Sequence, residues 1–142
     1  MCIRDRSLQD KVLALIPAVF DAAVNGGEAL QKTSAGALAA LAKAVPSKVI
    51  ANLLALVVPA LEDSGEADSA TGKRRGAAAV ASALVTDLGA ALAPYCVLML
   101  VPLMGRMSDP VPVVREMATR SFASLVPLLP VSYTHLEPTR PY

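Results

Sequence analysis

Three short apolar strings in this chain end in proline and recur at a nearly constant distance. They are Leu13-Ala-Leu-Ile-Pro17, Leu54-Ala-Leu-Val-Val-Pro59 and Leu98-Met-Leu-Val-Pro102, so their prolines stand 42 and 43 residues apart. A second register agrees, because Ala40-Leu41, Ala83-Leu84 and Ser124-Leu125 recur at spacings of 43 and 41. Such a period indicates stacked structural units, since one short repeat cannot bury its apolar face without a neighbour.

Each repeat contains two segments with the apolar periodicity of a helix. We expect helices over residues 8–24, 28–45, 48–62, 73–88, 94–107 and 113–129, with a solvated loop over residues 63–72 and a stop at Gly89. Helical pairs that repeat every 40–47 residues or so are typical of HEAT and armadillo arrays. The sequence therefore predicts an all-α protein, an α-α superhelix of about three HEAT-type hairpins, with units over about 7–46, 47–89 and 90–130.

The prolines and alanines of the repeat have an expected structural role. Pro17, Pro59 and Pro102 fall inside the first helix of each unit. A proline there removes one backbone hydrogen bond and usually kinks the helix. The second helix of the middle unit is rich in small residues (Ala77–Ala79, Ala81, Ala83), which allow neighbouring backbones to approach closely.

The two ends of the chain resemble translated sequencing-adapter DNA. MCIRDR at Met1–Arg6 and VSYTHL within Val131–Tyr142 can be back-translated into DNA strings that are reverse complements of each other. Such segments do not belong in an argument about fold. We therefore expect residues 1–6 and 131–142 to be artefacts, and residues 7–130 to be an internal fragment of a longer protein. The single histidine, His135, falls in the excluded tail.

The composition of residues 7–130 excludes several functional classes. Ten Lys/Arg balance ten Asp/Glu, so net charge gives no argument for nucleic acid or an anionic membrane. With no histidine and one cysteine, Cys96, this stretch cannot build a zinc site or a histidine-based triad. Its most apolar run, Tyr95–Met104, is ten residues long and is too short for a membrane span of about 20 residues.

Two groups of charged residues are candidate functional positions. Lys73, Arg74 and Arg75 form a basic cluster that we interpret as a surface patch paired with the preceding acidic loop, or as a contact for DNA or an acidic partner. Asp109 and Arg115 stand six residues apart, and we expect them to take part in a structural ladder of charge pairs along the stack. We predict no catalytic, cofactor-binding or metal-binding residue in this stretch. The acidic loop lacks the spacing of a calcium loop, and Gly72-Lys73 lacks that of a phosphate-binding loop.

The last repeat carries a more specific pattern. Gly105-Arg106-Met107-Ser108-Asp109, followed by Val114-Arg115-Glu116-Met117-Ala118-Thr119, resembles the final HEAT repeats of the TATA-binding-protein-associated factors that contain a Swi/Snf-type ATPase. The resemblance covers residues 73–130. Residues 7–72 indicate only a HEAT array.

The resemblance has several implications. It implies a nuclear parent that uses ATP to remove TATA-binding protein from DNA, with an ATPase domain following this stretch. No ATPase motif falls within this chain, so the chain itself needs no cofactor. Its expected partners are the neighbouring repeats and the ATPase domain, with TATA-binding protein and DNA reached through the parent, and no membrane. The alternative is a HEAT adaptor of another protein, active in transport or translation control and lacking a motor.

Overall fold

The computed structural model describes residues 3–129, apart from the side chains of residues 3–6, 46 and 47. Six α-helices follow one another in this part of the chain: α1 (Ile3–Asn25), α2 (Glu28–Ala44), α3 (Pro46–Glu62), α4 (Asp68–Leu88), α5 (Cys96–Arg106) and α6 (Pro112–Leu125). Two 3-10 segments, η1 (Gly89–Tyr95) and η2 (Val126–Leu128), complete it, and the described residues contain no strand. The tail that we interpret as adapter-derived, 131–142, lies outside the described residues, as do Met1 and Cys2.

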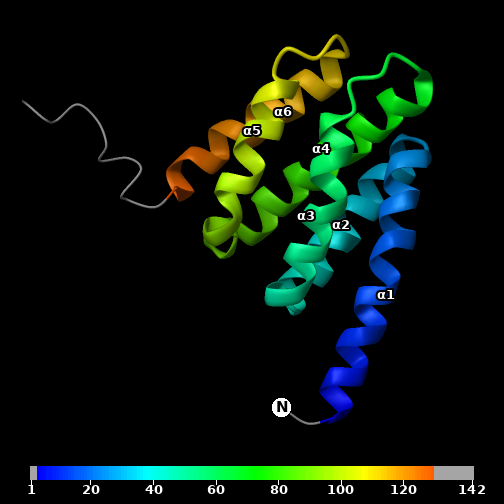
Figure 1. Ribbon diagram of the computed structural model, residues 1–142, viewed down its shortest axis with the longest axis vertical. Helices are drawn as coiled ribbons and strands as arrows, with labels where there is room; N and C mark the ends of the chain where they lie inside the picture. The colour runs from blue at the N-terminus through cyan, green and yellow to red at the C-terminus, as the bar shows by residue number, and fades with distance from the viewer. Residues whose placement is uncertain (1–2, 130–142) are drawn as a thin grey trace, which may run out of the picture.

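The helices form three hairpins that stack in two layers (Figure 1). Within the hairpins, α1 packs on α2, α3 on α4, and α5 on α6. Between hairpins, α3 lies between α1 and α5 in one layer, and α4 lies between α2 and α6 in the other. The predicted all-α superhelix of helical hairpins is confirmed, whereas its division into units at 46/47 and 89/90 stays a prediction.

The hydrophobic core runs without a break between the two layers. Its largest fully buried side chains come from all three hairpins and include Ile16, Leu38, Leu53, Leu84 and Leu103. Each second helix contributes a short stretch of small or branched residues to this core, such as Ala77, Ala78 and Ala81 of α4. Because no hairpin encloses a core of its own, the stability of each depends on its neighbours.

The repeated prolines lie where the sequence predicts them. Pro17, Pro59 and Pro102 are inside α1, α3 and α5, the first helix of each hairpin. Gly89 also ends α4 as expected, because its backbone adopts a φ of 50°, which glycine tolerates without a steric penalty.

Several helix limits differ from the expected ones, and α1 begins at Ile3 instead of residue 8. Helix α4 begins at Asp68, so the loop is limited to residues 63–67 instead of 63–72. Helix α5 begins at Cys96, after the 3-10 segment η1, and α6 ends at Leu125 instead of continuing to residue 129. Pro127 follows closely, and proline disfavours the continuation of an α-helix because it lacks a backbone N–H.

One helical stretch, Asp68–Arg106, is long and apolar enough to cross a membrane by length and composition. It comprises α4, η1 and α5, and the chain turns at η1 so that α5 does not continue the direction of α4 (Figure 1). A single stretch of this kind is weak evidence, because core helices of water-soluble proteins pass the same test. The expectation that the protein has no membrane partner stays a prediction.

Candidate functional site: a buried charge network between the second and third hairpins

A buried ion pair joins the second hairpin to the third. Arg74, on α4, donates from Nε to Oδ2 of Asp109, in the turn before α6, at 2.7 Å. The side chain of Arg74 is 4% exposed and that of Asp109 is 0% exposed. At such burial an unpaired charge would be costly, so the two groups depend on each other.

Arg74 also holds the loop of its own hairpin. Its Nη1 donates to the carbonyl oxygens of Asp63 and Gly65, at 2.9 and 2.7 Å. One guanidinium thus satisfies two loop carbonyls and one carboxylate. This multiple use is suited to arginine, whose planar group presents several donors in fixed directions.

Asp109 is the centre of the network. Its Oδ2 accepts a second bond, from Nη1 of Arg106 at 3.1 Å, and its Oδ1 accepts one from the backbone N–H of Val111 at 2.9 Å. The second of these bonds fixes the backbone just before α6 begins at Pro112. Arg115 donates from Nη1 to the carbonyl oxygen of Asp109 at 2.9 Å, so it supports the same turn.

The basic cluster expected over Lys73, Arg74 and Arg75 does not form a surface patch of three cations. Arg74 is 3% exposed and is committed to the network, so its assignment as a surface contact is wrong. Lys73 is exposed and lies 3.8 Å from a carboxylate oxygen of Asp63. This pair matches the interpretation in which the cluster is balanced by the acidic loop. Arg75 is half-buried, and its Nε is a buried atom without a hydrogen-bond partner in the described structure.

Asp109 and Arg115, which we expect in a ladder of charge pairs along the stack, make different contacts. The carboxylate of Asp109 faces Arg74 and Arg106, whereas Arg115 reaches the backbone carbonyl of Asp109. Among residues 3–129, the ion pair that joins two hairpins is Arg74–Asp109, and a ladder that continues along the stack stays a prediction. The sequence signal that could have identified the Arg74–Asp109 pair is the repeat itself, because Asp68 and Arg74 have the same six-residue spacing as Asp109 and Arg115.

The first and second hairpins meet in another way. Gly76 of α4 lies so close to α1 that an added Cβ would stand 2.6 Å from the carbonyl oxygen of Ala23 and from Cα of Val24. The amide of Gln31, on α2, donates to the same carbonyl at 3.2 Å. The backbones of α1 and α4 therefore approach each other closely at this interface. The sequence analysis did not identify Gly76 or Gln31 as important.

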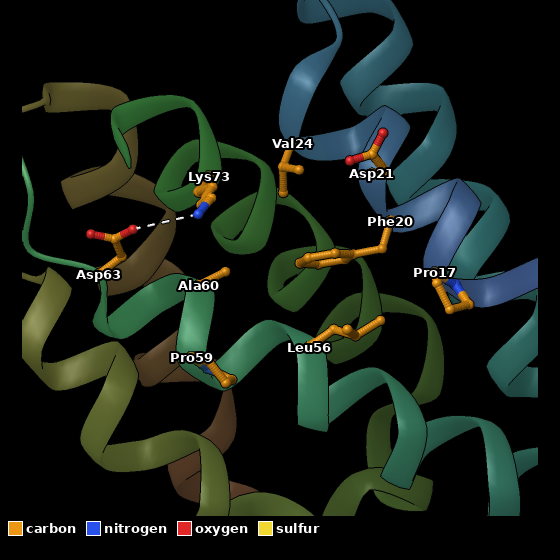
Figure 2. A pocket seen from close by; sticks show the side chains of 9 residues that line it. All are labelled: Pro17, Phe20, Asp21, Val24, Leu56, Pro59, Ala60, Asp63 and Lys73. Carbon is orange, nitrogen blue, oxygen red and sulfur yellow. Dashed lines mark ion pairs between the residues drawn. The ribbon is translucent and has the colours of Figure 1, made fainter. Parts of the chain in front are cut away.

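A hollow of ≈360 Å³ lies between α1 and α3, beside the start of α4 (Figure 2). Phe20 and Leu56 project into it from the two helices, and the Lys73–Asp63 ion pair lies at its edge (Figure 2). A second hollow of ≈430 Å³ crosses the layer of second helices between Lys32, Asp87 and Arg120. The hollow between α1 and α3 is lined chiefly by apolar side chains. Two of its charged residues, Lys73 and Asp63, form an ion pair with each other.

Within residues 3–129, no group of three or more His, Cys, Asp or Glu side chains could hold a metal ion. Cys96 is fully buried at the start of α5, and its Sγ lies 3.5 Å from the carbonyl oxygen of Leu92. Burial raises the pKa of the Cys96 thiol, which opposes formation of the reactive thiolate.

Comparison with curated proteins gives consistent matches over most of the chain. The TATA-binding protein-associated factor BTAF1 of Arabidopsis thaliana is 33% identical over 130 residues, which is 92% of this chain and 6% of that protein. The TATA-binding protein-associated factor mot1 of Schizosaccharomyces pombe is 34% identical over 129 residues, or 89% of this chain and 6% of that protein. The chain is related to the TATA-binding protein-associated factors.

The relationship extends further along the chain than residues 73–130, from which the resemblance was inferred. The human TATA-binding protein-associated factor 172 is 42% identical over 59 residues, which is 42% of this chain and 3% of that protein. The chain thus spans about one sixteenth of the length of the first two relatives. No family model matches the sequence, and no solved structure matches it.

Proposed function

We propose that this chain is a non-catalytic helical-repeat segment of an ATP-dependent remodeller that removes TATA-binding protein from DNA. The supporting observation is its similarity, over 89–92% of its length, to two proteins named as TATA-binding protein-associated factors. In this proposal the segment is the C-terminal part of a HEAT array, and it connects the repeats that hold TATA-binding protein to an ATPase domain of the same protein. ATP is the cofactor of that domain, and the nucleus is the site of action.

The charge network supports a mechanical role. A connecting segment transmits force only if its hairpins move together, and Arg74 ties a loop of the second hairpin to a turn of the third. Buried, multiply bonded charges resist small displacements because any lost bond leaves a polar group unsatisfied. The network would therefore act as a rigid joint within the array.

The first test is the sequence that follows residue 130 in the complete transcript. We expect a phosphate-binding loop and a DExx-type box within the next few hundred codons, because both are needed for ATP hydrolysis by a motor of this class. A stop codon or an unrelated domain at that place would contradict the proposal and favour a repeat adaptor without a motor.

The second test uses the full-length protein with Arg74→Lys, which keeps the charge but loses the forked geometry. We expect ATP hydrolysis and binding to TATA-binding protein to be retained, and the ATP-dependent release of TATA-binding protein from TATA-containing DNA to slow at least fivefold. Arg120→Lys, at an exposed ion pair on α6, is the matched control and should leave the release rate unchanged. Equal release rates for both variants would contradict a role in coupling.

A further inference from the structure

The repeated prolines each deprive one backbone carbonyl group of its usual hydrogen-bond donor. In an α-helix the N–H of a residue bonds to the carbonyl oxygen four residues earlier, and proline has no N–H. The prolines in question are Pro17, Pro59 and Pro102. The carbonyl oxygens that lose this partner, the freed carbonyl oxygens, belong to Leu13, Ala55 and Leu98. Among the side chains that the structure describes, none donates a hydrogen bond to these three oxygens.

The residues with freed carbonyl oxygens meet in pairs at two hollows in the layer formed by α1, α3 and α5. Leu13 and Ala55 line a hollow of ≈160 Å³ between α1 and α3. Ala55 and Leu98 line another, of ≈390 Å³, between α3 and α5. Figure 2 shows Pro17 on α1 and Pro59 on α3, at the two sides of the neighbouring hollow. The period of the prolines therefore places one freed carbonyl oxygen on each of three adjacent helices, at the same level of the layer.

The two hollows are apolar and lie on an exposed face. Ala55 and Leu98 are exposed, and no charged side chain lines either hollow. Asn52 lines the smaller hollow, and its amide donates to the carbonyl oxygen of Lys48 at 2.9 Å. A side chain that fits such a hollow has an apolar stem and ends in several N–H donors for the paired carbonyl oxygens. Lysine and arginine have this form.

The distance between the hollows indicates how two such side chains are joined. Neighbouring packed helices lie about 8–10 Å apart, so side chains that enter adjacent hollows are separated by a similar distance. A polyproline II helix has three residues per turn and rises by about 3.1 Å per residue, which places residues i and i+3 on one face about 9 Å apart. An extended segment that crosses the three helices therefore matches the two hollows.

We infer that the exposed face of α1, α3 and α5 is a docking surface for an extended basic segment of a partner protein, with two lysine or arginine side chains three residues apart. One cation enters each hollow and donates to the two freed carbonyl oxygens there. Such hydrogen bonds are stronger than those from a neutral donor because the donor is charged. The inference depends on the proline repeat and not on TATA-binding protein or ATP, so it can fail independently of the proposed function.

The test compares two hexapeptides of the same composition. Ac-Pro-Lys-Pro-Pro-Lys-Pro-NH2 holds its lysines on one face of a polyproline II helix, whereas Ac-Pro-Pro-Lys-Lys-Pro-Pro-NH2 points them in different directions. Binding to this chain, labelled with nitrogen-15, is measured by amide chemical-shift changes in an NMR titration. We expect the first peptide to bind at least fivefold more tightly, with shift changes confined to α1, α3 and α5. Equal affinities would overturn the inference, because net charge alone would then attract both peptides.

Pro59→Ala tests the role of the freed carbonyl oxygens. The alanine restores an N–H for the carbonyl oxygen of Ala55, the residue that lines both hollows. We expect the two peptides to bind this variant within twofold of each other. Pro112→Ala is the matched control, because Pro112 is the first residue of α6, where a proline removes no helical hydrogen bond. The control should keep the fivefold preference, and the same preference in Pro59→Ala would overturn the inference.

Pro17→Ala gives a second variant in case circular dichroism shows that Pro59→Ala is unfolded. It restores the donor for Leu13 alone, so it affects only the hollow between α1 and α3. The preference for the first peptide should fall at least twofold, and an unchanged preference would contradict the inference. Shift changes of the same amides when the chain is concentrated without peptide would also contradict it, because a second copy would then be the occupant.

Discussion

Arg74 and Asp109 stand 35 residues apart in the chain, and their side chains meet at 2.7 Å with almost no exposure to solvent. The pair connects a helix of the second hairpin to the turn that starts the last helix of the third. Arg74 also donates hydrogen bonds to the loop carbonyls of Asp63 and Gly65. Asp109 also accepts a hydrogen bond from the backbone N–H of Val111. One contact therefore organises two inter-helix connections.

Replacing Arg74 with methionine should lower the free energy of unfolding by about 3 kcal/mol, because removal of one partner leaves a buried charge without its main compensation. The value lies at the lower end of the usual range because Arg106 still faces Asp109. Urea unfolding followed by circular dichroism at 222 nm measures the change.

The matched control for this variant is Arg120→Met. Arg120 forms an ion pair with Glu116 in which both side chains are 68% exposed, and such surface pairs contribute about 0.5 kcal/mol or less. Similar losses for the two variants would mean that burial of the Arg74–Asp109 pair has no special importance.

Gly76→Ala should lower the free energy of unfolding by about 1–3 kcal/mol, the usual cost of forcing an extra carbon into a packed interface. The added Cβ would meet backbone atoms of α1 at 2.6 Å, and backbone cannot move aside as a flexible side chain can. Thermal or urea unfolding measures this loss.

Gly36→Ala gives the opposite expectation for the same chemical change. Gly36 also lies inside a helix, α2, but a Cβ added there meets nothing within 4 Å. The variant should gain about 0.5–1 kcal/mol from the better helix propensity of alanine. If Gly76→Ala were as stable as Gly36→Ala, the close approach between α1 and α4 would be refuted.

The helical architecture could be predicted from the sequence because it depends on local periodicity. Apolar residues at helical spacing place α2 and α3 and the end of α1 closely, and the glycines at 26, 27 and 89 separate helices where the sequence predicts it. The recurring prolines show how the three repeats align with one another in the sequence. These signals act over a few residues and therefore remain visible in a single sequence.

The start of α4 and the burial of Arg74 in an ion pair with Asp109 could not be predicted from local periodicity. Residues 63–72 are small, acidic and rich in glycine, which is typical of a loop. Helix α4 nevertheless starts at Asp68. It passes so close to α1 that a Cβ added to Gly72 would lie 3.1 Å from the carbonyl oxygen of Val24. The helix is thus held from its first turns by contacts with α1 and, through Arg74, with Asp109. Such contacts between distant residues leave no local pattern.

Met99→Ala and Met104→Ala compare one residue type at two positions of α5. Met99 is 1% exposed, and its truncation should cost about 2–5 kcal/mol through lost burial and the cavity that remains. Met104 is 53% exposed, so its truncation in this chain should cost less than about 0.5 kcal/mol. Urea unfolding of both variants checks the assignment of the buried face, and equal losses would mean that α5 is rotated about its axis.

Cys96 should make the stability of the protein depend on pH in the alkaline range. Burial raises the pKa of its thiol, so the folded state retains the proton at a pH where the unfolded chain, with a thiol pKa of about 8.5, has released it. Because the folded state then binds more protons, the stability is unaffected below pH 8.5 or so and falls as the pH rises through the folded pKa, by at most about 1.4 kcal/mol per pH unit. Urea unfolding of the wild type and Cys96→Ala between pH 7 and 10 isolates this contribution, since every other titrating group is common to both proteins. The two stability curves should converge with rising pH if Cys96→Ala is the less stable variant at pH 7, and parallel curves would show that the thiol does not titrate differently in the folded state.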